Sequence, residues 1–201
     1  WFLPTRNSQR EAIFSTAGTA TDDDILFEFN SDNNLRFYQR DSSGNPNVGL
    51  DIDDATLLPK LRWQHLAVVR NTKGILIYQD GVVKAYSEYS GSIPSDAQPI
   101  RFGSYDDGTI EFQGYADGLR ISKTSRYGNI DTPTAYLNSH QTAGRGKNTL
   151  LPHHTVVHIS SETATDGSTT FVDKSGTSII TATNSASHED TYALPWGNTA
   201  I

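Results

Sequence analysis

The chain has 201 residues, a length that suits one large β domain or one domain and part of a second. With 16 Lys and Arg against 23 Asp and Glu, its net charge of -7 argues against a nucleic-acid phosphate track and against docking on anionic lipid. The absence of cysteine excludes a disulfide framework, a thiolate metal site and a cysteine nucleophile. No apolar stretch has membrane-spanning length, and no signal peptide is present. Because Met is absent and Trp1 lies inside a predicted strand, we expect the chain to be a fragment of a longer polypeptide.

Short strand-like runs bounded by Gly, Pro, Asn and Asp fill the first 125 residues, and no segment there has a capped helical stripe. The predicted strands are 11–16, 24–30, 34–40, 62–70, 74–79, 82–87, 100–103 and 110–122. Alternation in 34–40 predicts one apolar and one polar face. Residues 41–49, which contain Gly44 and Pro46, are predicted to be a loop. This part of the chain is therefore predicted to be all-β.

Residues 62–86 contain two predicted hairpins. The first turn is Asn71-Thr-Lys-Gly74, with Gly74 expected to take positive φ. The second turn is Asp80-Gly81, the strongest short hairpin signal. Three consecutive strands therefore follow one another here.

Trp63 opens the first of these strands and is a large apolar group, so we expect it to close one end of the core. Truncation of a buried Trp to Ala costs roughly 3 to 5 kcal/mol, and we expect that loss for Trp63→Ala. His65 follows at the start of the same strand, and we interpret it as a packed or edge histidine and not as a general base.

Composition changes after Tyr127. Residues 128–147 are rich in polar and turn residues without a sustained period, which predicts a linker. Beyond the linker, strand-like runs return at 155–160, 169–176 and 178–184.

Acidic side chains gather in three places. They are Asp22-Asp23-Asp24, residues 51–54 and Asp106-Asp107. Oxygen-rich loops at a sheet rim can bind Ca²⁺, so Asp22, Asp23 and Asp24 are candidate calcium ligands, although the EF-hand glycine is missing. Ordinary solvated loop charge is the alternative for each cluster.

Tyr105 stands beside Asp106 and Asp107, which combines a stacking face with acceptor carboxylates. The three residues are therefore candidates for carbohydrate binding, with ordinary packing as the alternative for Tyr105.

No catalytic residues are predicted. His154 and His158 would lie about 13 Å apart on a strand, at ~3.3 Å per residue, which is too far to share one metal ion. Glu111 and Asp117 would lie roughly 20 Å apart on an extended strand, too far for either glycosidase mechanism. A Gly-x-Ser-x-Gly nucleophile elbow is absent from the sequence.

Four stretches follow in a fixed order: WQHLAVVR, GILIYQDGVV, IRFGS and FQGYADGLRIS. In order and spacing they resemble the concanavalin A-like, laminin-G-type jelly-roll family. The resemblance covers residues 1–127, without the family's first strands, and gives structural roles to Trp63, Gly74, Asp80, Gly81 and Asp117. It implies an antiparallel β-sandwich.

Residues 148–201 resemble the opening strands of a second copy of the same module. Such tandem copies resemble those of phage tail fibres and capsid-attached fibres, and also those of secreted bacterial surface proteins. The family includes lectins, calcium-dependent adhesion modules and a minority of glucanases, but the closely spaced Glu and Asp of the glucanases are missing here.

The resemblance implies a non-enzymatic structural and adhesion module at a virion surface or outside the cell. Its expected partners are other copies of itself, other virion proteins and host-surface polysaccharide, with calcium as a possible cofactor. The alternative is a carbohydrate-binding module of a secreted bacterial enzyme or surface protein. Residues 148–201 would then need completion by another chain, by further sequence or by docking on the first module.

Overall fold

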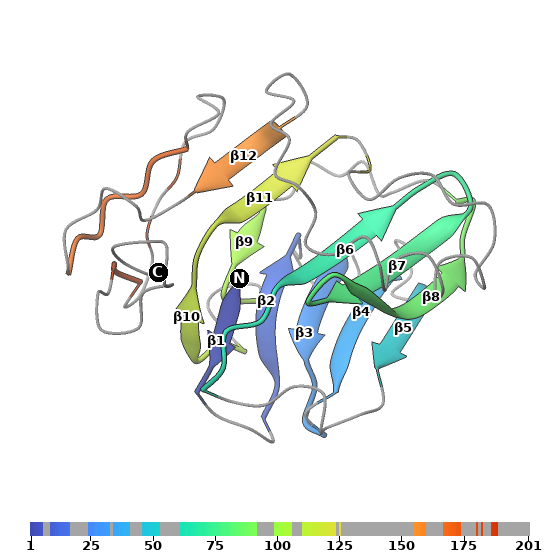
Figure 1. The fold of residues 1–201 in the computed structure, drawn as a ribbon, viewed down its shortest axis with the longest axis horizontal. Coiled ribbons are helices and arrows are strands. Elements are labelled where there is room, and N and C mark those ends of the chain that lie inside the picture. Colours follow the sequence, from blue (N-terminus) through green and yellow to red (C-terminus); the bar gives the residue numbers. More distant parts are fainter. Residues whose placement is uncertain are drawn as a thin grey trace.

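The computed structural model describes residues 1–5, 9–16, 24–32, 34–40, 46–52, 61–91, 99–105, 110–123, 125, 155–159, 167–173, 180, 182 and 186–188. Within these ranges the regular secondary structure is β throughout, and every named pair of strands is antiparallel (Figure 1). The prediction of an all-β antiparallel sandwich is confirmed.

The larger sheet has five strands in the order β5-β4-β3-β2-β9. They are β2 (Glu11–Ser15), β3 (Ile25–Phe29), β4 (Leu35–Arg40), β5 (Pro46–Ile52) and β9 (Arg101–Phe102). Phe27 pairs with Phe37, and Phe37 pairs with Leu50, so apolar residues line up across three strands. Such cross-strand rows stabilise a sheet and define its inner face.

The opposite layer contains a three-stranded sheet in the order β6-β7-β8. Its strands are β6 (Leu66–Arg70), β7 (Gly74–Gln79) and β8 (Val82–Glu88). β1 (Phe2–Pro4) pairs with β10 (Gly114–Ala116), and a bridge between Phe2 and Gln64 joins β1 to the segment that leads into β6. β11 (Leu119–Ser122) pairs with β12 (Thr155–Ile159).

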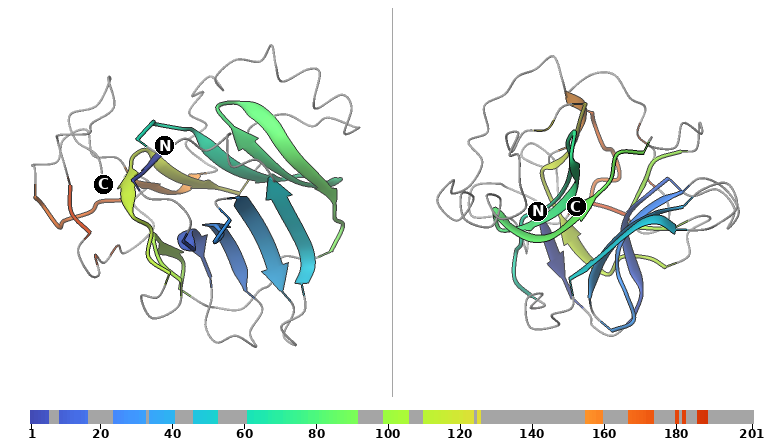
Figure 2. Two further views of the ribbon diagram at one scale, coloured as in Figure 1. Left: turned by 90° about the horizontal axis from the view of Figure 1, so that it is seen from below. Right: turned by 90° about the vertical axis from the view of Figure 1, so that its right-hand side faces the viewer.

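The main hydrophobic core lies between these two layers, which face each other in Figure 2. Strands β3, β4, β5 and β7 contribute alternate residues to it, as the side-chain period of two requires. The buried members are Phe2, Ile13, Phe27, Phe29, Leu35, Phe37, Val48, Leu50, Ile52, Leu66, Ile75 and Ile77.

The predicted loop at 41–49 was wrong in its second half, because β5 begins at Pro46. Val48, Leu50 and Ile52 alternate into the core, and this alternation extends beyond the turn residues that suggested a loop. Pro46 is compatible with a strand because it occupies the first position, where no ladder donor is needed.

Two turn predictions had different outcomes. Asp80 and Gly81 have φ of 51° and 82°, so both take the positive φ that a two-residue hairpin turn requires. Gly74 is not among the positive-φ residues, which corrects the expectation for it. Glycine is needed there because a Cβ would lie 2.1 Å from the backbone oxygen of Ser87 on the neighbouring strand.

Trp63 is half-buried and is absent from the main core, so the expectation that it closes the core was wrong. The side chain that points inward is its neighbour Gln64, which is fully buried and accepts a 2.7 Å hydrogen bond from the amide of buried Gln79. Because neighbouring residues of an extended chain point to opposite sides, burying Gln64 places Trp63 on the outer side.

The predicted run 110–122 is not one strand. β10 and β11 are separated by Asp117 and Gly118, and Gly118 has a positive φ of 61°. Asp117 is buried, and its backbone N–H donates a 3.0 Å hydrogen bond to the carbonyl of Trp1. Asp117 therefore lies at a turn that holds β1 beside β10.

Of the predicted second module, β12 docks on β11 of the first module. Residues 169–173 are not a strand, but Gly167 and Ser168 exchange backbone hydrogen bonds with His188. The predicted linker at 128–147 lies outside the described residues.

Candidate functional site

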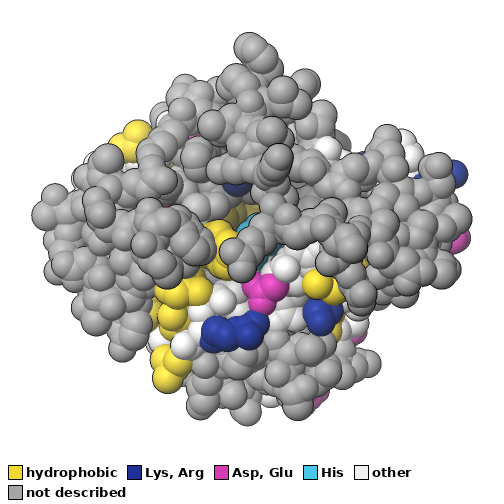
Figure 3. All heavy atoms as spheres, viewed as in Figure 1, with side chains coloured by type: hydrophobic (Ala, Val, Ile, Leu, Met, Phe, Trp, Pro, Cys, Tyr) yellow, Lys and Arg dark blue, Asp and Glu magenta, His cyan; other side chains and the backbone are white. Residues whose placement is uncertain are grey.

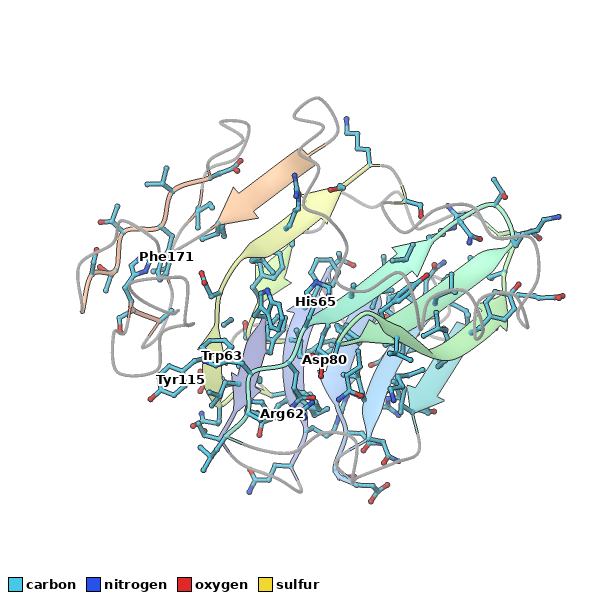
Figure 4. The ribbon with its side chains drawn as sticks, in the orientation of Figure 1. Arg62, Trp63, His65, Asp80, Tyr115 and Phe171 are labelled. Carbon is cyan, nitrogen blue, oxygen red and sulfur yellow. The ribbon has the colours of Figure 1, made fainter. Side chains whose placement is uncertain are left out.

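The side of the β6–β7 layer that faces away from the main core, here called its outer side, holds a second buried cluster of Val69, Leu76, Tyr78 and Val83. Near its junction with β1 and β10 this side carries a group of aromatic and charged side chains. We call it the Trp63 face and define it by Arg62, Trp63, His65, Asp80 and Tyr115, all labelled in Figure 4. Three different segments supply these residues: the lead-in to β6, the turn after β7 and strand β10.

Asp80 is the fixed acceptor of this face. Its Oδ1 accepts a 2.9 Å hydrogen bond from the backbone N–H of His65, and its Oδ2 accepts a 2.7 Å hydrogen bond from Nη2 of Arg62. The side chains of Arg62 and Asp80 are 58% and 38% exposed, so this ion pair is open to solvent. Exposed pairs contribute little to stability but present donors and acceptors in a set orientation.

His65 contacts Asp80 through its backbone, and its side chain is neutral at ordinary pH. Burial, followed by the positive charge of the Trp1 amino group, lowers the pKa of His65 to about 4, although the carboxylate of Asp80 acts in the opposite direction. Its ring packs edge-on against the indole of Trp1, with ring centroids 5.3 Å apart. The interpretation of His65 as a packed histidine agrees with this geometry.

Trp63 and Tyr115 flank Leu3 in one row across the outer side. Leu3 pairs with Tyr115, and the Phe2–Gln64 bridge places Trp63 across from Leu3 on its other edge. Strands are spaced about 4.8 Å apart, so the two aromatic residues start roughly 10 Å apart. Leu3 is only 5% exposed, while both rings remain half-buried.

Figure 3 shows apolar, basic and acidic side chains next to one another near the centre of the view, with a histidine beside them. Partly buried aromatic rings beside polar groups suit ligands that have an apolar face and hydroxyl groups. The Trp63 face therefore combines a surface for stacking with groups that can hydrogen-bond a ligand.

A second polar cluster lies on the outer side of the five-stranded sheet, which we call the charged face. Its members are Arg10, Asp24, Glu28, Arg36, Tyr38, Arg40 and Tyr105. The polar side predicted for 34–40 is thus present, but Tyr38 on it is only 5% exposed.

Glu28 is the centre of the charged face and is fully buried. Its Oε2 accepts hydrogen bonds of 3.0 and 2.9 Å from Nε and Nη2 of Arg10, and its Oε1 accepts bonds from Nε and Nη2 of Arg36. One carboxylate therefore serves two guanidinium groups, each through two nitrogen donors.

Tyr38 lies between two arginines. The guanidinium carbons of Arg36 and Arg40 lie 5.0 and 4.6 Å from the centre of its ring, and Nη2 of Arg40 donates to the Tyr38 hydroxyl at 3.1 Å. Both arginines thus cover the ring, and burial raises the pKa of Tyr38.

Two candidates from separate sequence clusters meet on the charged face. The hydroxyl of Tyr105 donates a 3.1 Å hydrogen bond to Oδ2 of Asp24, 81 residues away in sequence. Burial, followed by the charge of Asp24, raises the pKa of Tyr105 to about 12. The other candidates of these clusters, Asp22, Asp23, Asp106 and Asp107, lie outside the described residues.

The surroundings of Asp24 do not fit a calcium ligand. Its carboxylate is fully buried, and its Oδ2 lies 3.9 Å from Nη1 of Arg40, a cation that would repel Ca²⁺. Among the described residues, no group of three His, Cys, Asp or Glu side chains could hold a metal ion.

The acidic residues of the charged face are not arranged for glycoside hydrolysis. Asp24 and Glu28 are four residues apart along one extended segment, or roughly 13 Å, whereas paired catalytic carboxylates lie about 5 to 9.5 Å apart. Both oxygens of Glu28 accept hydrogen bonds from arginine, so neither presents a proton to a leaving group.

The sequence contained one signal for the ion pairs that were not predicted. Glu28 and Arg36 lie four residues before and four residues after Asp32, a turn residue, and pair directly across β3 and β4. Opposite charges placed symmetrically about a short turn predict such a cross-strand pair. The Arg62–Asp80 pair has no comparable local signal, because Arg62 precedes the regular strand.

The part of the chain that the structure describes contains no helix long and apolar enough to cross a membrane. In the comparisons with known proteins, the family model of the concanavalin A-like lectin/glucanases superfamily matches residues 1–128. No curated protein and no solved structure matched the chain.

Proposed function

Because the chain belongs to the concanavalin A-like lectin/glucanases superfamily, we propose that it is a non-enzymatic glycan-binding module that contacts its ligand through the Trp63 face. The observation that supports this most directly is the row of partly buried Trp63 and Tyr115 beside the exposed Arg62–Asp80 pair. Aromatic rings receive the apolar face of a sugar ring, and the fixed ion pair offers hydrogen bonds to its hydroxyls.

The Trp63 face is favoured over the charged face for a physical reason. The charged face uses its carboxylates and its Tyr38 ring within the protein, where they are buried and covered by arginine. The pair on the Trp63 face is exposed and can engage a ligand without breaking a buried network. Tyr105, with Asp106 and Asp107, is the second candidate location for glycan contact.

A glycan array tests this proposal, with the unaltered chain compared with Trp63→Ala, Tyr115→Ala and Tyr105→Ala in buffers with and without EDTA. We expect Trp63→Ala and Tyr115→Ala each to weaken binding at least about tenfold, as loss of a stacking contact does. Tyr105→Ala is the matched aromatic control and should retain binding. EDTA should leave binding unchanged, because Asp24 does not fit a calcium ligand.

Each outcome on the array has a definite meaning. Loss of binding in Tyr105→Ala but not in Trp63→Ala would move the glycan site to the charged face. Loss of binding in EDTA would show that calcium takes part after all. Absence of binding by the unaltered chain in both buffers would refute the lectin function. As a control, melting curves must show that each variant is folded.

The absence of hydrolysis is a separate part of the proposal and needs its own assay. Incubation with laminarin and agar should release no reducing ends. Release that disappears in Glu111→Gln would make the chain a glycoside hydrolase.

The proposed setting is the surface of a virion or the outside of a cell, where weak single-site glycan contacts gain strength from display in many copies. The likeness of residues 148–201 to the opening of a second module supports a tandem array. The alternative setting is a carbohydrate-binding module of a secreted bacterial enzyme or surface protein. Flanking fibre or coiled-coil repeats would favour the first setting, and a flanking catalytic domain with a signal peptide would favour the second.

A further inference from the structure

Strand β12 forms a two-stranded sheet with β11, a strand of the family-matched region, although β12 lies outside that region in sequence. The family match ends at residue 128, yet β12 pairs along β11 of the matched region. Leu119 pairs with Ile159, Arg120 with His158 and Ile121 with Val157. Ile159 is only 6% exposed, so this pairing buries an apolar side chain as well as joining two backbones.

The connection between the two strands is long. It comprises the 32 residues from 123 to 154. A chain of that length can span at most roughly 100 Å at about 3.3 Å per residue. Its length therefore allows β12 to reach the β11 edge of another molecule as well as the β11 edge of its own.

β12 is attached by one edge only. Among the described residues its sole strand partner is β11, whereas inner strands such as β3 and β4 are paired on both edges. A short strand bound along one edge opens at a much smaller free-energy cost than a strand in the middle of a sheet. β12 can therefore leave β11 while the sandwich of β1 to β10 stays folded.

We propose that the β11 edge is an interchain docking site and that its partner is β12 of a second copy, with two chains exchanging β12 reciprocally. The exchanged dimer keeps every backbone pair of the β11–β12 ladder, so the two forms differ mainly in the entropy of association. A long connection lowers the effective concentration of a chain's own β12, which reduces the advantage of the unexchanged form. Exchange therefore increases with protein concentration.

Disulfide trapping tests this directly, because the chain contains no cysteine of its own. The test uses two single variants, Arg120→Cys and His158→Cys, at positions that pair across β11 and β12. Directly paired strand positions have the Cα separation that a disulfide needs. The two variants are mixed under native conditions, oxidised gently, and their covalent dimers are mapped by peptide mass spectrometry.

The expected product is a mixed dimer linked through positions 120 and 158, in a proportion that rises with concentration. Arg120→Cys mixed with Glu88→Cys is the matched control, because Glu88 is exposed at the end of β8 and pairs with Gly74. The control should give only the background of random collision. A chain carrying both Arg120→Cys and His158→Cys measures the unexchanged form by its internal disulfide.

Two results would overturn the proposal. An internal disulfide in the double variant at every concentration, with mixed dimers no more frequent than in the control, would show that β12 stays on its own module. Absence of both kinds of disulfide would show that β12 is not the partner of the β11 edge. Light scattering on the unaltered chain provides an independent readout, with a mass that should approach twice the monomer mass as concentration increases.

Discussion

On the charged face the acidic side chains are fully buried and tied to arginine and tyrosine, whereas on the Trp63 face the acidic side chain is 38% exposed. Glu28 accepts hydrogen bonds from two arginines, while Asp80 accepts one from Arg62 and one from a backbone N–H. Both faces carry charged and aromatic groups, so composition alone does not separate them. Their burial does, since a buried ionic network supports the fold and an exposed one can serve a ligand.

The largest expected effect that tests this difference is on stability at the charged face. Glu28→Gln leaves two guanidinium groups without their carboxylate, and loss of one partner of a buried pair costs about 3 to 5 kcal/mol. Since Arg10 and Arg36 are partly exposed, we expect the lower end of that range. The measurement is urea unfolding at neutral pH, with Glu88→Gln at an exposed position as the matched control, expected within about 0.5 kcal/mol of the unaltered chain. Equal stability of the two variants would show that the ion pairs of the charged face do not stabilise the fold.

The second prediction concerns His65 on the Trp63 face and uses pH. The pKa of His65 is about 4 in the folded chain against 6.5 ordinarily, so the unfolded chain binds more protons between these values. The contribution of neutral His65 to stability is therefore complete above pH 6.5, is lost as pH falls toward 4, and changes no further below pH 4. We expect a loss of about 2 to 3 kcal/mol across this window.

His65→Gln isolates that contribution from the protonation of carboxylates. The difference in unfolding free energy between the unaltered chain and the variant should shrink steadily as pH is lowered from 6.5 to 4. A difference that stays constant over this range would show that His65 is not buried in its neutral form.

The smallest expected effect is the stability change of Trp63→Ala. A fully buried Trp would cost roughly 3 to 5 kcal/mol, but the indole is half-buried outside the main core, so we expect about 1 kcal/mol. Thermal or urea unfolding measures this change. A loss above about 3 kcal/mol would show that Trp63 is part of the core and would argue against its role as a ligand contact.

Much of the fold could be predicted from local pattern. Alternation of apolar residues located β2, β3 and β4, and the Asp80-Gly81 pair located the β7–β8 turn. β5 was missed because Pro46 and Gly49 are typical loop residues, and the alternation of their neighbours was not weighed.

The candidate sites were harder to predict because they depend on contacts between distant segments. Tyr105 and Asp24 meet across 81 residues, a pairing that no local pattern specifies. Trp63 was misplaced for a related reason: size and apolarity favour the core, but strand alternation decided between Trp63 and Gln64. The fold buries Gln64 in place of Trp63, and this is possible because Gln79 lies within hydrogen-bond distance of Gln64.

The Gln64–Gln79 pair has a consequence for how the chain avoids wrong structures. If β6 slipped by one residue against β7, every side chain of β6 would change sides, and the amide of Gln79 would face apolar groups without Gln64. A buried amide without its partner is costly, so the slipped sheet lies at higher free energy even though Trp63 would then enter the core. The two glutamines thus specify the strand register, because they raise the free energy of the slipped sheet more than they stabilise the native one.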